Sequence, residues 1–170
     1  GVLSEWEDPE RAVRFALRLQ LEVLEREWPA TLLLRPEASE VRAADGTVLF
    51  RGPRLRCAMH MGSVQRVGGA LDVVGGPALY QVARLVATLH GGQLVLSDRA
   101  WRAVDGLLGD VRIDDLGLHR LIGVKGLSRL VQVQPPQLVG RVFEQPLTLD
   151  VVRSNAPPVR ASFLGRDGDL

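Results

Sequence analysis

Residues 75–97, GGPALYQVARLVATLHGGQLVLS, contain a helix and a buried strand joined by a tight turn. Pro77 suits the first helical position, where its missing N–H group has no helical partner to lose. The glycines of the HGG segment are typical of a helix end. The apolar run after them predicts a buried strand, and Ser97 at its end suits the N-cap of another helix. The stretch therefore predicts alternating helices and strands around a helix over residues 77–89.

A second helix is expected upstream, from about Asp8 to Trp28. Asp8 followed by Pro9 is a helix start in which a capping side chain precedes a proline. At about 100° per residue, the apolar positions span an arc of roughly 240°, wider than one core face requires. They are Val13, Phe15, Leu17, Leu19, Leu21, Val23, Leu24 and Trp28. Two interpretations remain open: deep burial within one domain, or a flank that meets a second protein.

Short strands are expected in most of the remaining sequence. GVLSEW at residues 1–6 reads as a strand, and residues 29–53 read as a hairpin insertion with a tight turn at Asp45-Gly46. Residues 55–67 have strand composition, and so do the three segments DVRIDDL, LHRLIGV and RLVQVQ. This order of elements predicts an α+β fold with helices on one face of a mostly antiparallel sheet.

The composition excludes several classes of protein. The 170 residues include 21 Lys and Arg against 20 Asp and Glu, a net charge of +1, so nucleic acid is not expected as a partner. The single cysteine, Cys57, cannot form an internal disulfide, and three separated histidines cannot assemble a zinc site. No apolar run approaches the roughly 20 residues that span a bilayer, and the first residues do not resemble a signal peptide. We therefore expect a cytoplasmic protein without direct membrane insertion.

Arg84 is the only charged residue within the helix expected over residues 77–89. Because an unpaired buried cation is unfavourable, Arg84 should reach solvent, pair with a carboxylate, or point into a site that holds an anion. Gly75 and Gly76 allow close backbone approach at a helix N-terminus, where free N–H groups suit a phosphate. The residues alone leave these alternatives open.

Four blocks, in this order along the chain, resemble the class III adenylate and guanylate cyclase domain. EDPERAVRFALRLQ is similar to a family helix, and RLRCAMHMG to the strand written RxGxHxG. GGPALYQVARL with HGGQLVLSDRAW is similar to GPxVNxAARL followed by GGQxLxS, and DDLGLHRLIGV to the closing LGxHxLKG strand. The resemblance implies a ferredoxin-like nucleotide cyclase fold. It also implies that residues 1–134 form an N-terminally incomplete cyclase-like domain, because the family's first metal-binding strand and hairpin have no counterpart here.

The resemblance also implies roles for individual residues. Arg84 matches the family's transition-state arginine, which neutralises the charge that develops on the α-phosphate of a nucleoside triphosphate. The family's ribose-binding asparagine, one helical turn earlier, falls on Tyr80, which cannot reproduce the amide contact. Asp72 falls near the base-selecting position, and Gly75 and Gly76 would admit the phosphates. The family's two metal ions, Mg²⁺ or Mn²⁺, would have to be held by residues outside this chain.

The C-terminal part reads differently from the rest. From Pro135 the sequence becomes a proline-rich linker, and residues 163–170 loosely match the first residues of a regulatory ATPase that follows cyclase domains in larger proteins. We therefore expect residues 135–170 to form a linker and the start of a downstream module that this chain lacks.

These observations leave three functions open. In the first, a degenerate cyclase-like domain serves as a dimerisation, docking or regulatory module of a larger protein, and this chain alone is inactive. In the second, the chain supplies Arg84 to an active half-site that converts ATP or GTP to a cyclic nucleotide and pyrophosphate, while a partner's aspartates hold the metals. In the third, the domain binds ATP or GTP without turnover. The first two require a second cyclase-like domain or another protein subunit as partner.

Overall fold

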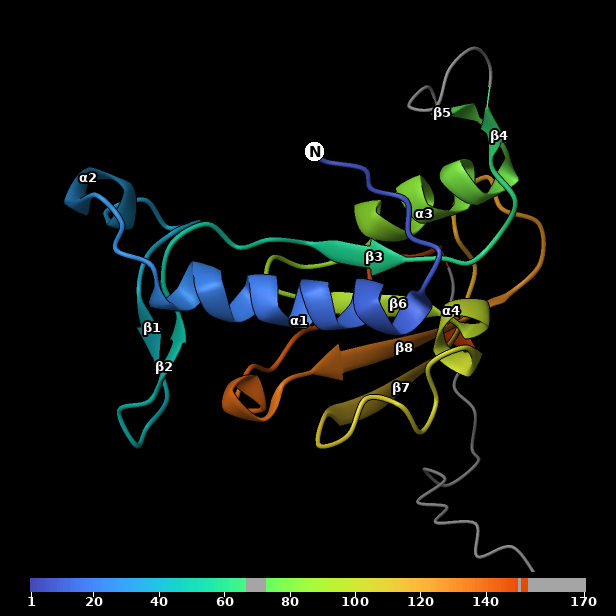
Figure 1. Cartoon of the computed structure of the whole chain (residues 1–170). Coiled ribbons are helices and arrows are strands. Elements are labelled where there is room, and N and C mark those ends of the chain that lie inside the picture. Colours follow the sequence, from blue (N-terminus) through green and yellow to red (C-terminus); the bar gives the residue numbers. More distant parts are fainter. Residues whose placement is uncertain (67–72, 150, 153–170) are drawn as a thin grey trace, which may run out of the picture.

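The computed structural model describes residues 1–66, 73–149 and 151–152. In these residues a five-stranded sheet has the order β3-β6-β8-β7-β9 (Figure 1). The strands are β3 (Cys57–Met59), β6 (Leu94–Ser97), β7 (Arg112–His119), β8 (Ser128–Gln134) and β9 (Val151–Val152). Strands β3 and β6 run parallel, and the other neighbouring strands run antiparallel. The predicted mostly antiparallel sheet is therefore confirmed.

Helices and two small hairpins surround this sheet. The helices are α1 (Pro9–Glu25), α2 (Ala30–Leu33), α3 (Pro77–Ala87), α4 (Asp98–Arg102) and a 3₁₀ turn (Pro136–Leu138). The hairpins pair β1 (Val41–Arg42) with β2 (Val48–Phe50), and β4 (Gln65–Arg66) with β5 (Val73–Gly75). Figure 1 shows α2 and the β1–β2 hairpin at one end of the molecule, and the β4–β5 hairpin and the start of α3 at the other. No helix in the described part of the chain has both the length and the apolar content that a bilayer crossing requires.

Helices cover both faces of the sheet. Helices α1 and α4 pack against Leu94 and Leu96 of β6, whereas α3 packs against Val95 of the same strand. Successive residues of a strand point to opposite faces, so β6 is buried from both sides. The predicted α+β class is confirmed, but the expectation that helices lie on one face is wrong. A strand such as LVLS has apolar side chains on both faces, so both faces have to be packed against other elements.

Helix α1 begins as predicted and ends early. Pro9 is its first residue, and the Asp8 carboxylate accepts a hydrogen bond from a backbone N–H of the first turn at 3.2 Å. The helix ends at Glu25, before the predicted end at Trp28. The Trp28 indole N–H donates a hydrogen bond of 2.8 Å to the carbonyl of Val23. Trp28 thus lies beyond the helix and satisfies a carbonyl of its last turn.

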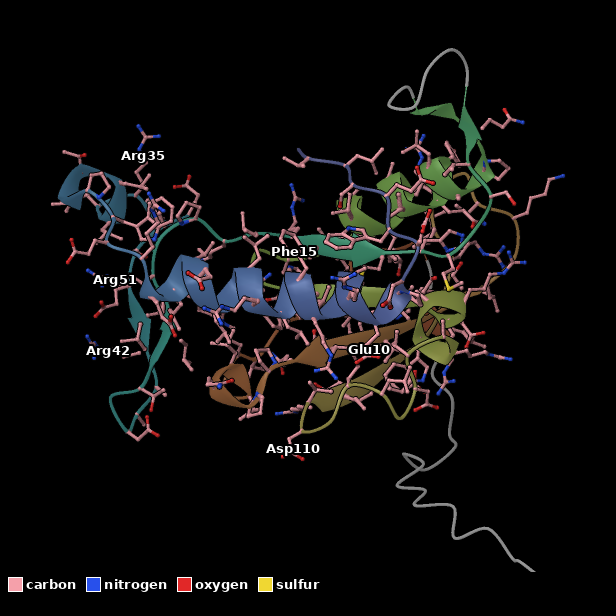
Figure 2. All side chains as sticks on the ribbon, viewed as in Figure 1. Glu10, Phe15, Arg35, Arg42, Arg51 and Asp110 are labelled. Carbon is pink, nitrogen blue, oxygen red and sulfur yellow. The ribbon has the colours of Figure 1, made fainter. Side chains whose placement is uncertain are left out.

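Part of the apolar arc of α1 remains open to solvent. Val13 and Leu17 belong to the core, whereas Phe15 is 50% exposed and lies on the outer side of the helix (Figure 2). Phe15 contacts the exposed Trp6, with ring centroids 5.2 Å apart. The remaining apolar positions are half-buried: Leu19, Leu21, Val23 and Leu24. One side of the helix is therefore in the core, as deep burial predicts, and the flank at Phe15 is uncovered in this chain.

Two strand predictions are wrong. Residues 1–6 have no regular secondary structure and are exposed, because they pair with no strand of the described part. The segments DVRIDDL and LHRLIGV do not form two strands, because β7 continues from the first into the second. A bulge between Asp115 and Gly117 changes the register within β7. Strand β7 ends at His119, and residues 121–126 form turns that include Gly123 with φ +76°.

The first part of the predicted linker packs on the domain. Leu138 is buried, Arg141 is 5% exposed, and the Arg141 guanidinium donates a hydrogen bond to Gln20 of α1. Farther along, β9 pairs with β7. Residues 136–149 therefore extend the packed body. Residues 153–170, where the start of a second module is predicted, lie outside the described residues.

Candidate functional site

Helix α3 carries two of the residues assigned to a site, Tyr80 and Arg84, and Gly76 is its N-cap. It lies in the connection between the parallel strands β3 and β6, and Leu85 and Leu89 at its end contribute to the core on that face of the sheet. The outward face of the helix is exposed at Tyr80, Arg84 and Ala87. Residues three and four apart lie on the same side of a helix, so the sequence places these side chains in one row.

Arg84 stacks on Tyr80 and does not pair with a carboxylate. The guanidinium carbon lies 4.8 Å from the centroid of the tyrosine ring, and both residues are exposed. Among the described residues, no carboxylate lies within ion-pair distance of Arg84. Of the three alternatives, the structure thus has Arg84 at the surface, held by a cation–π contact.

The Tyr80 ring reaches the turn between β7 and β8. A Cβ atom added to Gly123 would overlap the Tyr80 hydroxyl, so the phenol lies directly against this glycine. The sequence does not predict this contact, because Tyr80 and Gly123 are far apart along the chain. The glycine in a tight turn after β7 is the one local signal, but glycine is common in turns that make no such contact.

Gly76 has a structural role in this arrangement. It is the N-cap of α3 with φ +124°, a conformation that favours glycine, and no side chain caps the helix. A Cβ atom at this position would lie 3.3 Å from the backbone nitrogen of Gln65 and 3.4 Å from the carbonyl oxygen of Ser63. Chain packing therefore accounts for Gly76 without a phosphate. Gly75 ends β5 beside it, and Asp72 lies outside the described residues.

Two histidines near the sheet make internal hydrogen bonds. The Nδ1 atom of His60 lies 2.9 Å from the hydroxyl of Ser97, the residue that caps α4 as predicted. Burial, with a smaller contribution from the charge of Arg99, lowers the pKa of His60. His119 is fully buried and contacts the Thr148 hydroxyl at 2.9 Å. Both rings have partners that hold the fold together.

Residues 1–66, 73–149 and 151–152 offer no group of three or more His, Cys, Asp or Glu side chains that could hold a metal ion. The donors that Mg²⁺ or Mn²⁺ prefers are carboxylate oxygens. The described residues on the exposed face of α3 supply a phenol, two alanine methyl groups and a guanidinium instead. This lining does not fit a divalent cation.

Two adenylate cyclases of Trypanosoma brucei, analysed in their monomeric state, have similar structures. Their TM-scores with this chain are 0.65 and 0.67 at 23% and 21% sequence identity. The matches cover 84% and 85% of this chain, and 70% and 69% of those chains. The chain therefore has the adenylate cyclase fold, which confirms the predicted fold class.

Proteins from a fungus, a bacterium and a virus are among those similar in sequence. An adenylate cyclase of Mycosarcoma maydis is 26% identical over 102 residues, which are 58% of this chain and 4% of that protein. An uncharacterized protein of Mycobacterium tuberculosis is 36% identical over 118 residues, 69% of this chain and 40% of that protein. A protein of Acanthamoeba polyphaga mimivirus, provisionally named a serine/threonine-protein kinase/receptor, is 25% identical over 142 residues, 78% of this chain and 8% of that protein. No family model matches the sequence. The chain thus corresponds to a small part of the mimiviral and fungal proteins.

Proposed function

We propose that this cyclase-like domain is a docking or regulatory module of a larger protein, and that the chain alone makes no cyclic nucleotide. The observation that carries the proposal is the contact between Arg84 and Tyr80, 4.8 Å from guanidinium to ring centroid. A guanidinium that stabilises charge on a phosphate must point its N–H groups at the phosphate oxygens. The N–H groups lie in the plane of the guanidinium, so the ring of Tyr80 on its face does not block them. The ring holds Arg84 along the surface of α3, and the phenol takes up the space beside it as far as Gly123.

The position of Tyr80 supports loss of the nucleotide site. In the family that the sequence resembles, an asparagine at this position contacts the ribose. The phenol in its place is larger, cannot donate two amide N–H bonds, and extends as far as Gly123. A nucleotide that entered between α3 and the β7–β8 turn would have to displace this ring.

Uncovered apolar groups support a protein partner. Trp6 and Phe15 form an exposed aromatic pair. Strand β3 pairs only with β6, so its other edge is unpaired in the described part of the chain. Exposed aromatic side chains and unpaired strand edges both favour association with another protein chain. A second cyclase-like domain or another subunit is the partner that we propose.

The alternative function is an active half-site, and one observation favours it. Arg84 is exposed and has no carboxylate partner in the described residues, so its guanidinium is free to turn toward a ligand. In this alternative Arg84 neutralises charge on the α-phosphate of ATP or GTP, and pyrophosphate leaves. Residues Gly75, Gly76 and Asp72 would lie toward the phosphates and the base. A partner subunit would supply the ligands for Mg²⁺ or Mn²⁺.

A cyclase assay on matched variants distinguishes the two functions. The wild-type chain, R84A and Y80N are assayed for cyclic nucleotide formation from ATP and from GTP with Mn²⁺, alone and with a candidate catalytic partner. R18A is the control, because Arg18 is exposed and pairs with Glu22 on α1, away from α3. We expect background rates in every sample. A rate that falls on R84A and is unchanged on R18A would overturn the docking function and support the half-site.

A further inference from the structure

Two arginine side chains lie against Phe50, the last residue of β2. Figure 1 shows β2 at the end of the molecule opposite the start of α3. The guanidinium carbons of Arg141 and Arg54 lie 4.4 and 4.9 Å from the centroid of the Phe50 ring. Arg141 is buried, and it donates hydrogen bonds to the Leu49 carbonyl at 2.6 Å and to the Gln20 amide oxygen at 3.1 Å. Burial, with the nearby charge of Arg54, lowers the pKa of Arg141 to about 10.

The turn between α3 and β6 is shaped around these side chains. A Cβ atom on Gly91 would lie 2.7 Å from the Cβ atom of Arg54, and one on Gly92 would lie 2.5 Å from the Phe50 ring. Gly92 also has φ +95°, and its carbonyl accepts a hydrogen bond from Arg141 at 3.4 Å. The glycine pair therefore packs directly against the stem of Arg54 and the Phe50 ring, where a larger residue would not fit.

The cluster lacks a nearby negative charge. In the described part of the chain no carboxylate lies within ion-pair distance of Arg54 or Arg141. The Nε atom of Arg54 is buried and has no hydrogen-bond partner. Two neighbouring cations, one with an unsatisfied donor, are unfavourable in a partly buried setting. A bound anion would offset the charge of the two guanidinium groups, although it would not reach the buried Nε atom.

A surface hollow of about 520 Å³ opens beside Arg54. It lies between α2 and the turn, and its charged lining residues are Arg35, Glu37 and Arg54. Figure 2 shows Arg35 at the same end of the molecule as Arg51 and Arg42, where the β1–β2 hairpin also lies. Arg42 and Arg51 are paired with Glu40, and Arg35 and Arg54 are the cations among the residues that line the hollow.

We propose that this hollow binds the phosphate or pyrophosphate group of a small molecule. Arg54 and Arg35 contact the anion, because the planar guanidinium fork matches two phosphate oxygens at once. Arg141 is a positioning residue: its guanidinium packs on the Phe50 ring, and Arg54 packs on the same ring. Glu37 repels the anion at the rim of the hollow. The hollow is separate from the start of α3, which lies at the other end of the molecule.

Calorimetric titration of the full chain with pyrophosphate and with inorganic phosphate tests the proposal. We expect pyrophosphate to bind, and R54Q to weaken binding by about tenfold, which corresponds to one charge-assisted hydrogen bond. R35Q should weaken binding less, and E37Q should tighten it by about threefold through removal of repulsion. R18Q, on the exposed face of α1, should bind like the wild type. Each variant is first shown to melt within a few degrees of the wild type.

Three results would overturn the proposal. One is the absence of heat with millimolar pyrophosphate. Another is equal weakening by R54Q and R18Q, which would indicate a general charge effect without a defined site. The last is loss of binding in R84A together with full binding in R54Q, which would place the anion at α3. This last comparison also separates failure of the anion site in the hollow from failure of the docking function.

Discussion

Arg84 and Arg141 each lie against an aromatic ring, and they differ in what surrounds the pair. Arg84 stacks on the exposed Tyr80 at a helix surface, with its other face in water. Arg141 lies against Phe50 inside the molecule and donates to three acceptors from three separate segments. We therefore expect the exposed contact of Arg84 with Tyr80 to break easily and the buried contact of Arg141 with Phe50 to persist. Burial and hydrogen bonding decide the difference, since the cation–π contact itself is weak at an exposed site.

The largest effect is expected for R141A. The substitution leaves the Gln20 amide oxygen and the Leu49 carbonyl without their donor and opens a cavity beside Phe50. We expect the free energy of unfolding to fall by about 2–4 kcal/mol. Urea denaturation measures it, with R18A as a control that changes stability by less than about 0.5 kcal/mol. A loss in R141A as small as that of the control would contradict the rigidity of this region.

The contact between Tyr80 and the β7–β8 turn gives the next largest effect. G123A places a Cβ atom on a residue with φ +76°, in the path of the Tyr80 hydroxyl. We expect the free energy of unfolding to fall by about 1–2 kcal/mol, because the backbone is strained and the Tyr80 ring is displaced. G126A is the matched control, because Gly126 lies in the same connection with φ +81° and has open space at the Cβ position.

A double variant separates the two causes. Removing the hydroxyl in Y80F should restore part of the stability lost in G123A and none of that lost in G126A, because only Gly123 faces the phenol. Equal losses in the two glycine variants, unaffected by Y80F, would mean that Tyr80 does not press on the turn and is free to leave the face of α3.

R84Q should have a smaller effect on stability. It removes a cation–π contact at an exposed site and no ion pair within the described residues. We expect a decrease in the free energy of unfolding of about 0.5 kcal/mol. Thermal melting of R84Q beside R141A compares the two regions directly. A loss in R84Q as large as that in R141A would show that the surface pair is as rigid as the buried one.

The smallest expected effect concerns pH. His60 has a pKa below its ordinary value of 6.5 in the folded chain, because burial and the charge of Arg99 disfavour its protonated form. The unfolded chain then binds more protons between the two pKa values, so this histidine makes the protein less stable as the pH falls below about 6.5. Unfolding curves at several pH values should show that the free energy of unfolding falls less steeply with decreasing pH in H60Q than in the wild type. An identical decline would assign the pH dependence to other groups.

Local signals in the sequence predicted several elements correctly. The proline at the start of α3, the Ser97 cap and the apolar run of β6 each act through neighbouring residues, and the structure has all three. The start of α1 at Asp8 and Pro9 was also correct. The order of blocks along the chain led to the adenylate cyclase fold, which the solved cyclases confirm.

Errors arose where the outcome depends on distant partners. The two segments that merge into β7 look like separate strands because a bulge at Gly117 interrupts their alternation, and only pairing with β8 joins them. The sequence after Pro135 has the composition of a linker, and it does not indicate that Arg141 finds acceptors on α1, the hairpin and the turn. Tyr80 stands where the family has a ribose-binding asparagine, and the sequence does not indicate its contact with Gly123.

The helix starts, the apolar strands and their order follow from the amino-acid sequence, because caps, proline and apolar runs act over a few neighbouring residues. Which arginine is held and which is free, and which aromatic side chains stay uncovered, is settled only once the chain has folded. Those properties depend on the acceptors and rings that other segments bring within about 3–5 Å, and such distances do not follow from spacing along the chain.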